Sequence, residues 1–226
     1  MRAVMMEAFG APETAVVKEL PSPVPGPGQV AIRTRAAGVN YPDLLVVEGK
    51  YQHKPPLPFI PGKELAGEIT AVGDGVTGWK PGDRVMAQME YGAFAEEVVA
   101  GTDQCFAMPD GMAFADAAAM GLVYQTAWFA LLDRGGFTPG ETVLVLGATG
   151  GVGMAAIQLV KALGGTALAG VSTMSKADAA RESRLHKKGH REARARALTL
   201  TLTLTLTLTL TLTLTLTLPP LTLTLT

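Results

Sequence analysis

One short segment constrains the fold more than any other: the apolar run Thr142–Leu146 leads directly into Gly147-Ala-Thr-Gly-Gly-Val-Gly153. A short apolar run rich in β-branched residues is typical of a strand buried on both faces. A helical pattern from Val152 to Leu163 follows, and Gly164 is a typical helix stop. A second apolar run, Thr166–Ser172, predicts another strand. The segment therefore predicts the strand–turn–helix–strand unit of a doubly wound α/β domain.

The glycines of this turn have a spacing that suits contact with phosphate. Gly147, Gly150 and Gly153 form a G-x-x-G-x-x-G pattern. Glycine lets backbone N–H groups approach a pyrophosphate, the helix N-terminus offers partial positive charge, and the last glycine lets helix and strand pack closely. Because a strand precedes the helix and another follows it, the pattern predicts dinucleotide binding. The residues expected at the pyrophosphate are Gly147, Thr149, Gly150, Gly151, Val152 and Gly153.

The end of the second predicted strand favours one nicotinamide cofactor over the other. In NAD enzymes an Asp or Glu at this place binds the adenosine ribose, whereas this chain has Ser172-Thr-Met-Ser-Lys176. A hydroxyl and an ammonium group can neutralise a 2′-phosphate, so Ser172 and Lys176 favour NADPH over NADH. The alternative for Lys176 is an exposed lysine that opens the next helix.

The chain before this unit has a different pattern. From Met1 to about Pro109, short β-like segments alternate with Gly/Pro turns, which predicts a small all-β, barrel-like domain. The segment Phe114–Leu132 then reads as one helix, with Asp116 as a candidate cap and Gly135-Gly136 as the stop. The predicted strands are Ala3–Ala8, Ala15–Glu19, Gln29–Ala36, Glu64–Val72, Asp83–Ala87, Ala93–Val99 and Gln104–Met108.

Several motifs fall in a distinctive order within the first part. They are Ala36-Ala-Gly-Val-Asn-Tyr-Pro-Asp43, Gly49-Lys-Tyr51, Leu57-Pro-Phe-Ile-Pro-Gly-Lys-Glu-Leu-Ala-Gly67, Val72-Gly-Asp-Gly-Val76 and Lys80-Pro-Gly-Asp-Arg-Val85. With the glycine turn, they resemble the zinc-free medium-chain dehydrogenase/reductases, and most nearly their NADPH:quinone oxidoreductase (ζ-crystallin-like) branch. The resemblance covers about Met1 to Lys176. It implies an α/β protein with a GroES-like β-barrel domain over 1–112 and an incomplete Rossmann domain over 113–180.

The resemblance also implies an activity and roles for three residues. The activity is hydride transfer from NADPH to a quinone or an α,β-unsaturated carbonyl compound. In the family, the residue matching Asn40 helps to hold the nicotinamide and the substrate carbonyl, and a buried amide suits that role because it is both donor and acceptor. The residue matching Tyr51 lines the substrate cleft, and the one matching Thr126 lies near the nicotinamide. The proton needed in the reaction could come from Tyr51 or from water.

Each of these three residues also has a plain structural interpretation. Outside its motif, Asn40 would be taken as a turn residue before Pro42. Tyr51 lies beside a Pro-rich loop, where packing is an equally good explanation. Thr126 could equally be an interhelical hydroxyl in an Ala-rich region.

A catalytic zinc site is not expected. The zinc-dependent relatives carry a Cys where Asn40 stands and a His where Lys63 stands, and no Cys lies near 122–124. Catalytic zinc needs three Cys, His or carboxylate ligands around an open position. We therefore predict no metal and assign no chemistry to Lys63.

The segment 181–226 does not continue the α/β pattern. The chain through Ala180 has 12 basic and 18 acidic residues, a net charge of −6, whereas the remainder has 7 and 2, a net charge of +5. A basic run, Arg181 to Ala197, precedes strict Leu-Thr alternation from Leu198 to Leu218. We interpret this low-complexity tail as a frame-shifted tandem repeat rather than a domain. Disorder or non-native β association is favoured over membrane insertion, because half of the alternating residues are Thr. The basic run lacks aromatic residues that would stack on RNA bases.

The remaining expectations follow from this division. An incomplete domain should leave an open sheet edge, with Val143, Val145, Ile157 and Leu168 facing absent elements. The first domain could then fold alone, and the chain would be either a reductase, an inactive fragment of one, or a protein that associates through its tail. The expected partner is a small quinone or enone, without nucleic acid or membrane. Full-length relatives are commonly homodimers, which is doubtful here. One cysteine, Cys105, and no signal-peptide pattern favour the cytoplasm.

Overall fold

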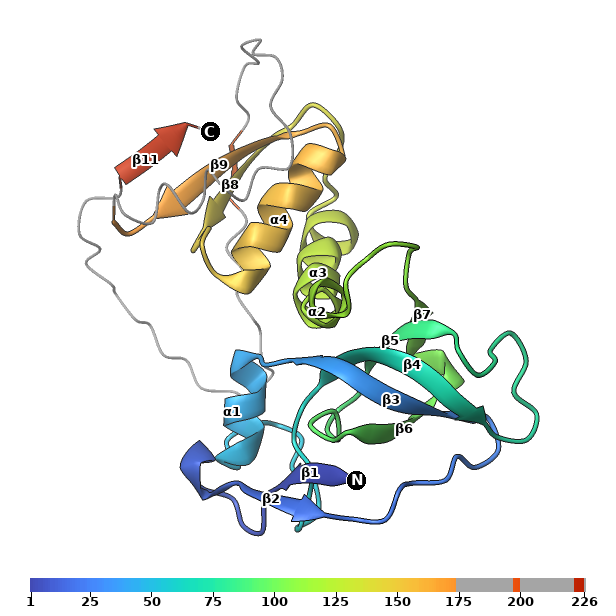
Figure 1. Cartoon of the computed structure of the whole chain (residues 1–226). Coiled ribbons are helices and arrows are strands. Elements are labelled where there is room, and N and C mark those ends of the chain that lie inside the picture. Colours follow the sequence, from blue (N-terminus) through green and yellow to red (C-terminus); the bar gives the residue numbers. More distant parts are fainter. Residues whose placement is uncertain (174–196, 200–221, 226) are drawn as a thin grey trace. The chain divides into compact units, whose positions relative to one another are not determined.

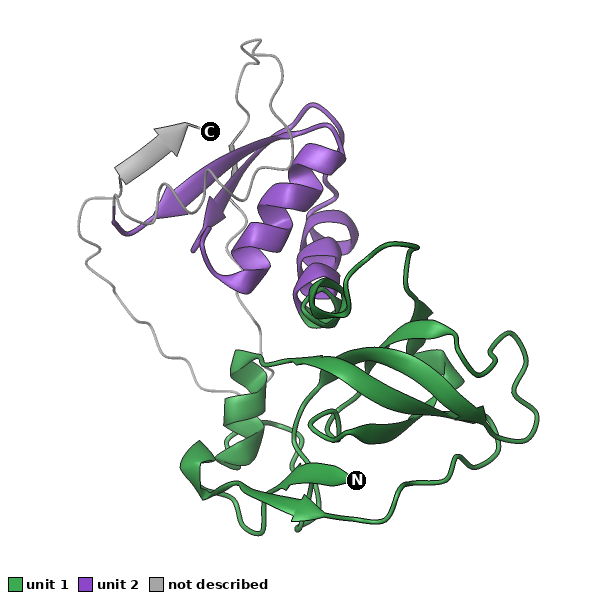
Figure 2. Cartoon of the chain, viewed as in Figure 1, with its two compact units in different colours: residues 1–122 green, residues 123–226 purple. Residues whose placement is uncertain are grey.

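The computed structural model describes residues 1–173, 197–199 and 222–225, and the chain divides into two compact units, Met1–Leu122 and Val123–Thr226 (Figures 1 and 2). The sequence places the first boundary after residue 112. In the structure, helix α2 (Phe114–Ala118) belongs to unit 1, because its Ala117 and Ala118 are buried against Ala66 and Met108.

Unit 1 is built on a five-stranded antiparallel sheet. Its order is β6-β3-β4-β5-β7, and β3 and β4 form the long central pair (Figure 1). A separate antiparallel pair joins β1 (Arg2–Met5) to β2 (Val16–Glu19). The strands of the main sheet are β3 (Gln29–Gly38), β4 (Glu64–Val72), β5 (Arg84–Gln88), β6 (Glu97–Gly101) and β7 (Cys105–Ala107). The 3-10 turns η1 (Pro12–Thr14) and η2 (Thr102–Gln104) lie between them.

The strands expected in unit 1 are present, but one helix was not expected. Helix α1 (Tyr41–Val47) starts directly after Asn40, where a turn before Pro42 was the structural alternative that we considered for Asn40. Its first turn holds Pro42, which is well tolerated there because the first helical N–H groups have no intrahelical acceptor. The Asp43 carboxylate accepts a hydrogen bond of 2.7 Å from the Asn40 backbone N–H. Asn40 is therefore the N-cap of this helix.

The single helix predicted over Phe114–Leu132 is wrong. Three helical pieces stand there: α2, α3 (Gly121–Trp128) and the π-helical turn η3 (Phe129–Arg134). A hydrogen bond accounts for the start of α3 after the break: the Leu122 backbone N–H, in its first turn, donates to the Glu64 carboxylate on β4 at 2.7 Å. A new helix can start there because one of its unpaired N–H groups is bound by a side chain.

Unit 2 contains the predicted strand–turn–helix–strand unit. Strands β8 (Thr142–Leu146) and β9 (Thr166–Val171) are parallel neighbours, and α4 (Gly151–Ala162) connects them. Val143, Val145 and Ile157 are buried in the unit's own core, so the expectation that they face absent elements is wrong for all three. The α3–η3 segment also contributes to this core, through Ala127 and Leu131.

The outer sides of β8 and β9, which we expected to be open, are paired in the structure. Residues Ala197–Thr199 (β10) pair in parallel with β8, and Thr222–Leu225 (β11) pairs antiparallel with β9, which gives the order β10-β8-β9-β11. An unpaired strand edge presents free N–H and C=O groups to any compatible segment. Both additional strands come from the part of the chain that we expected not to form a domain. Among the residues that the structure describes, no helix is long and apolar enough to cross a bilayer.

Candidate functional site

The glycine turn of unit 2 has the conformation that its sequence requires. Gly147 has a φ of +67°, a region that residues with a Cβ rarely adopt. A Cβ built at position 153 would lie 2.3 Å from the Gly147 carbonyl oxygen, so only glycine lets α4 approach the end of β8 this closely. Gly150 is the N-cap of α4, and its own N–H donates to the Gly147 oxygen at 3.0 Å. The turn is therefore fixed by two glycines with different functions: one bends the chain and one allows close packing.

A cavity of about 610 Å³ lies beside this turn. One wall is the glycine turn and the start of α4, and the other walls come from β8 and from the α3–η3 segment. The lining residues are Thr126, Ala127, Ala130, Leu131, Val143, Leu144, Val145, Leu146, Gly147, Gly150, Gly151, Val152, Gly153 and Ala156.

These residues fit the pyrophosphate of a dinucleotide cofactor. The first N–H groups of α4 have no intrahelical acceptor, and the helix dipole favours an anion at that end. Gly150 and Gly151 are exposed, so they place no Cβ between a ligand and these N–H groups. The apolar residues of β8 and η3 on the other walls can cover a flat ring. The cavity therefore offers an anion-binding end and an apolar end.

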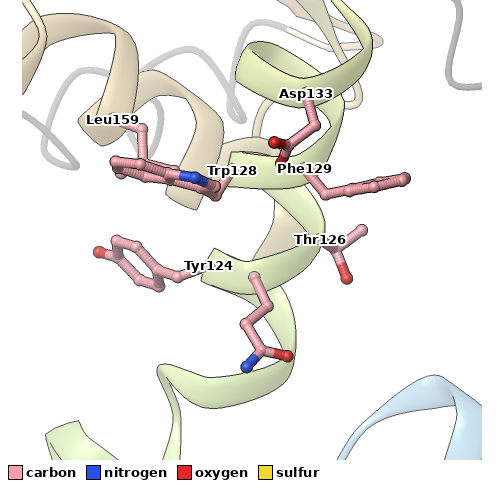
Figure 3. A pocket seen from close by; sticks show the side chains of 7 residues that line it. Tyr124, Thr126, Trp128, Phe129, Asp133 and Leu159 are labelled. Carbon is pink, nitrogen blue, oxygen red and sulfur yellow. The ribbon is translucent and has the colours of Figure 1, made fainter.

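Helix α3 presents two different faces near this cavity (Figure 3). Tyr124 and Trp128 lie on one side, where the Tyr124 hydroxyl donates a hydrogen bond to Gln158 of α4 and burial raises the pKa of Tyr124. Thr126 of α3 and Phe129, the first residue of η3, point to the other side. A second pocket, of about 710 Å³, lies along this helix, and its other lining residues are Gln125, Asp133 and Leu159. Thr126 lines both hollows.

In unit 1, a buried carboxylate holds the side chain of Asn40. The Asn40 Nδ2 atom donates to Glu64 Oε1 at 2.6 Å, while Glu64 Oε2 accepts the Leu122 N–H. Glu64 is only 2% exposed. Gly38 and Gly121 make room for it, because a Cβ at either position would lie 2.4 Å or 2.8 Å from one of its oxygens.

Lys63, next to Glu64, forms the second part of this cluster. Its ammonium is buried, donates to the Glu90 carboxylate at 2.9 Å and to the Glu90 carbonyl at 3.0 Å, and lies 4.6 Å from the centre of the Tyr51 ring. A cation over an aromatic face is attracted by the ring quadrupole. We assigned Lys63 no chemistry from the sequence; in the structure it joins Tyr51 to Glu90.

Asp43 completes the cluster, and it is 2% exposed. Burial raises the pKa of the Asp43 carboxyl, and the neighbouring charge of Glu64 raises it further. The Asn40 N–H and the Lys63 ammonium act in the opposite direction, yet the net shift of this pKa is upward. Desolvation therefore exceeds the favourable contacts at this site.

Comparison with known proteins shows what this chain is similar to. Residues 26–110 match the alcohol dehydrogenase GroES-like domain. The human synaptic vesicle membrane protein VAT-1 homolog is 42% identical over 185 residues, which are 81% of this chain and 47% of that protein. Human quinone oxidoreductase is 40% identical over 166 residues, 73% of this chain and 50% of that protein. The Escherichia coli quinone oxidoreductase, solved in complex with NADPH, superposes with a TM-score of 0.75 at 32% identity, over 81% of this chain and 56% of that one. The chain is therefore similar to quinone-oxidoreductase-type medium-chain dehydrogenase/reductases.

Only part of such a protein is matched, because the chain spans about half the length of the curated relatives. The matched part contains both the GroES-like domain and the glycine turn. The α/β fold predicted from the motifs is confirmed, with a barrel-type unit followed by a partial Rossmann-like unit.

The site residues predicted for this family lie in both units. Thr126, Gly147, Gly150, Gly151, Val152 and Gly153 line one cavity of unit 2. Thr149 is half-buried in the same turn but does not line the cavity, and Ser172 is exposed directly after β9. Lys176 lies outside the described residues. In unit 1, Asn40 and Tyr51 contact the adjacent residues Glu64 and Lys63.

Sequence reasoning missed Glu64. Its only signal was a carboxylate at the start of a predicted strand, Glu64–Val72. Buried carboxylates occur in proteins when they are paired or hydrogen-bonded, so this position could have been examined for partners.

Proposed function

We propose that this chain binds NADPH in the cavity at the glycine turn and belongs to an oxidoreductase that reduces quinones or α,β-unsaturated carbonyl compounds. The observation that carries the proposal is the cavity beside the start of α4, which is lined by Gly147, Gly150, Gly151 and Gly153. A quinone oxidoreductase with 32% identity was solved with NADPH bound, which supports the same class of cofactor here.

Bound NADPH supplies the hydride, and the chain's own residues bind and orient the reactants. The backbone N–H groups of Gly151 to Gly153, at the start of α4, would hold the pyrophosphate. Ser172 and Lys176 would meet the 2′-phosphate, and Thr126 would lie at the nicotinamide end. In unit 1, Asn40 would hold the nicotinamide and the substrate carbonyl, and Tyr51 would line the substrate cleft.

No metal is proposed for the reaction, because Asn40 and Lys63 stand where the zinc-dependent members of the family carry Cys and His. The structure gives the Lys63 ammonium a different use, since it is bound by Glu90 and Tyr51. The polarising group for the substrate would be the Asn40 amide. We place this activity in the cytoplasm, in line with a single, buried cysteine.

The first test is unfolding of the purified chain with NADPH, with NADH and without nucleotide. A ligand that binds only the folded state stabilises it by about 2.7 kcal/mol at a hundred times its dissociation constant. We expect stabilisation by NADPH and less by NADH. If neither nucleotide changes the transition while the chain is folded, the proposal is wrong and the chain is a folded but inactive relative.

A charge-reversal variant at the turn makes this test specific. Gly150 has φ −78° and ψ 162°, and Asp is a preferred N-cap residue in that conformation, so Gly150→Asp should leave the free chain as stable or more stable. Its carboxylate would occupy and repel the pyrophosphate position, so the stabilisation by NADPH should disappear. Gly150→Ser is the matched control, because it keeps a capping side chain without the charge. Equal NADPH stabilisation in Gly150→Asp and wild type would contradict the assignment.

A further inference from the structure

The contacts of Glu64 determine which way round the Asn40 amide lies. Both partners of the carboxylate are N–H donors: Asn40 Nδ2 at 2.6 Å from Oε1 and the Leu122 backbone N–H at 2.7 Å from Oε2. An ionised carboxylate can only accept, whereas an amide side chain has one accepting and one donating end. The amide of Asn40 must therefore direct its nitrogen, Nδ2, toward Glu64 and its oxygen, Oδ1, away from Glu64.

The surroundings of Glu64 keep it in this position. It is 2% exposed, and two glycines, Gly38 and Gly121, stand where any larger residue would collide with its oxygens. The Leu122 N–H belongs to the first turn of α3 and cannot reverse its polarity. Because one oxygen is committed to that N–H, the other is left for Asn40.

We propose that Glu64 is a positioning residue that orients the Asn40 amide for ligand binding. The proposal rests on the proposed function, in which Asn40 contacts the nicotinamide and the substrate. One Nδ2 hydrogen is used by Glu64, so the amide offers Oδ1 as an acceptor and its second N–H as a donor. A primary carboxamide has the complementary pair of groups, an N–H donor and a carbonyl acceptor.

The informative variant is Glu64→Gln, which keeps the shape of the side chain. An amide at position 64 must direct its oxygen to the Leu122 N–H, because that donor cannot turn. Its NH2 group would then face Asn40 Nδ2, donor against donor, unless the Asn40 amide rotates by a half-turn. Glu64→Gln should therefore reverse Asn40. Glu68→Gln is the matched control: Glu68 lies on the same strand, β4, but pairs with Arg35 in a half-exposed ion pair at 2.7 Å.

The orientation can be measured without any nucleotide. In NMR spectra of the ¹⁵N-labelled chain, the side-chain NH2 signals of Asn40 are identified by their loss in the Asn40→Ala variant. We expect one Asn40 hydrogen to be shifted downfield and protected from exchange in the wild type and in Glu68→Gln, and this signature to be lost in Glu64→Gln. Unchanged Asn40 signals in Glu64→Gln would overturn the proposal.

A second variant covers the case in which Glu64→Gln is too unstable to study. The double variant Glu64→Gln/Asn40→Asp restores a donor–acceptor pair, because the new amide can donate to the new carboxylate. The double variant should be more stable than Glu64→Gln alone. A double variant that is no more stable would show that polarity does not govern this contact, and would overturn the proposal.

Nucleotide titration then links the orientation to function. We expect Glu64→Gln to weaken NADPH binding about tenfold, equivalent to about 1.4 kcal/mol, with Glu68→Gln unchanged. NADPH binding that is equally tight in wild type and Glu64→Gln would overturn the proposal while leaving the proposed function intact. If the wild type binds no NADPH, the proposed function fails, and the amide signals and the double variant alone decide the role of Glu64.

Discussion

Substituting Gly153 by Ala tests how α4 packs on β8. The added Cβ would lie 2.3 Å from the Gly147 oxygen and 2.9 Å from the Ala148 Cα, and both of these are backbone atoms. Ordinary Cβ contacts begin near 3.4 Å, so the helix would have to move by about 1 Å. Such overpacking costs about 1–3 kcal/mol, and the better helix propensity of Ala returns at most about 1 kcal/mol. We therefore expect Gly153→Ala to lower the free energy of unfolding of unit 2 by about 1–2 kcal/mol.

Gly151→Ala, two residues earlier in the same helix, is the matched control. Its Cβ would meet only a methyl group of Val123, at 3.0 Å, and a side chain can shift by a few tenths of an ångström. The propensity gain should then make this variant neutral or slightly more stable. The two variants contain the same added atoms, so their difference isolates the contact with the backbone of the turn.

The assay is urea unfolding followed by tryptophan fluorescence. The chain has two tryptophans, Trp79 in unit 1 and Trp128 in unit 2, so a Trp79→Phe background leaves a single reporter of unit 2. Midpoints and slopes give the stability difference between the variants. Equal stability of Gly153→Ala and Gly151→Ala would refute the close approach of helix and turn described above.

Three further predictions concern unit 1. Because the pKa of Asp43 is raised, its carboxyl keeps a proton to higher pH in the folded chain than in the unfolded chain. Its contribution to stability is therefore complete below the ordinary pKa of 3.8 and is lost as pH rises through the pKa of the folded chain. Urea unfolding across this pH range should show that decline in the wild type and not in Asp43→Asn. Cys105 is buried, and its pKa is raised to about 11. At neutral pH a thiol reagent should therefore label it slowly in the native chain and rapidly in urea. Rapid labelling of the native chain would contradict its burial. Glu90→Gln removes the carboxylate that pairs with the buried Lys63 ammonium, and it should destabilise the chain by about 1–3 kcal/mol in urea unfolding. Glu7→Gln is the control, because Glu7 pairs with Lys18 at the surface; it should cost less than about 1 kcal/mol.

The local pattern of the sequence was enough to predict most strands and the whole β8–α4–β9 unit. These elements could be predicted because their signals are local: alternating or continuous apolar runs, separated by glycine and proline, involve only residues that are close in the sequence. The break between α2 and α3 could not be predicted in this way, because the Leu122 N–H is bound by Glu64, which lies 58 positions earlier. Helix α1 was missed for another reason: Asn40 before Pro42 matches a turn as well as a helix start, and the Asp43 contact that distinguishes them is a matter of geometry.

The candidate site was predictable to a similar degree. The glycine turn carries its own signal, since its spacing implies both the bend and the close packing at Gly153. Asn40 and Tyr51 came from resemblance, and the sequence offered no indication of what would hold them. Glu64 and Lys63 supply those contacts from adjacent positions at the start of β4, one with a carboxylate and one with an ammonium group.

The separation of the hydrophobic clusters has a genetic consequence. Every residue of the three clusters in unit 1 precedes residue 122, and every residue of the cluster in unit 2 follows it. A substitution within the cluster of unit 2 therefore removes no side chain from the hydrophobic clusters of unit 1. Core substitutions in the two halves of the gene therefore act on separate hydrophobic clusters, and the two halves can accumulate them independently.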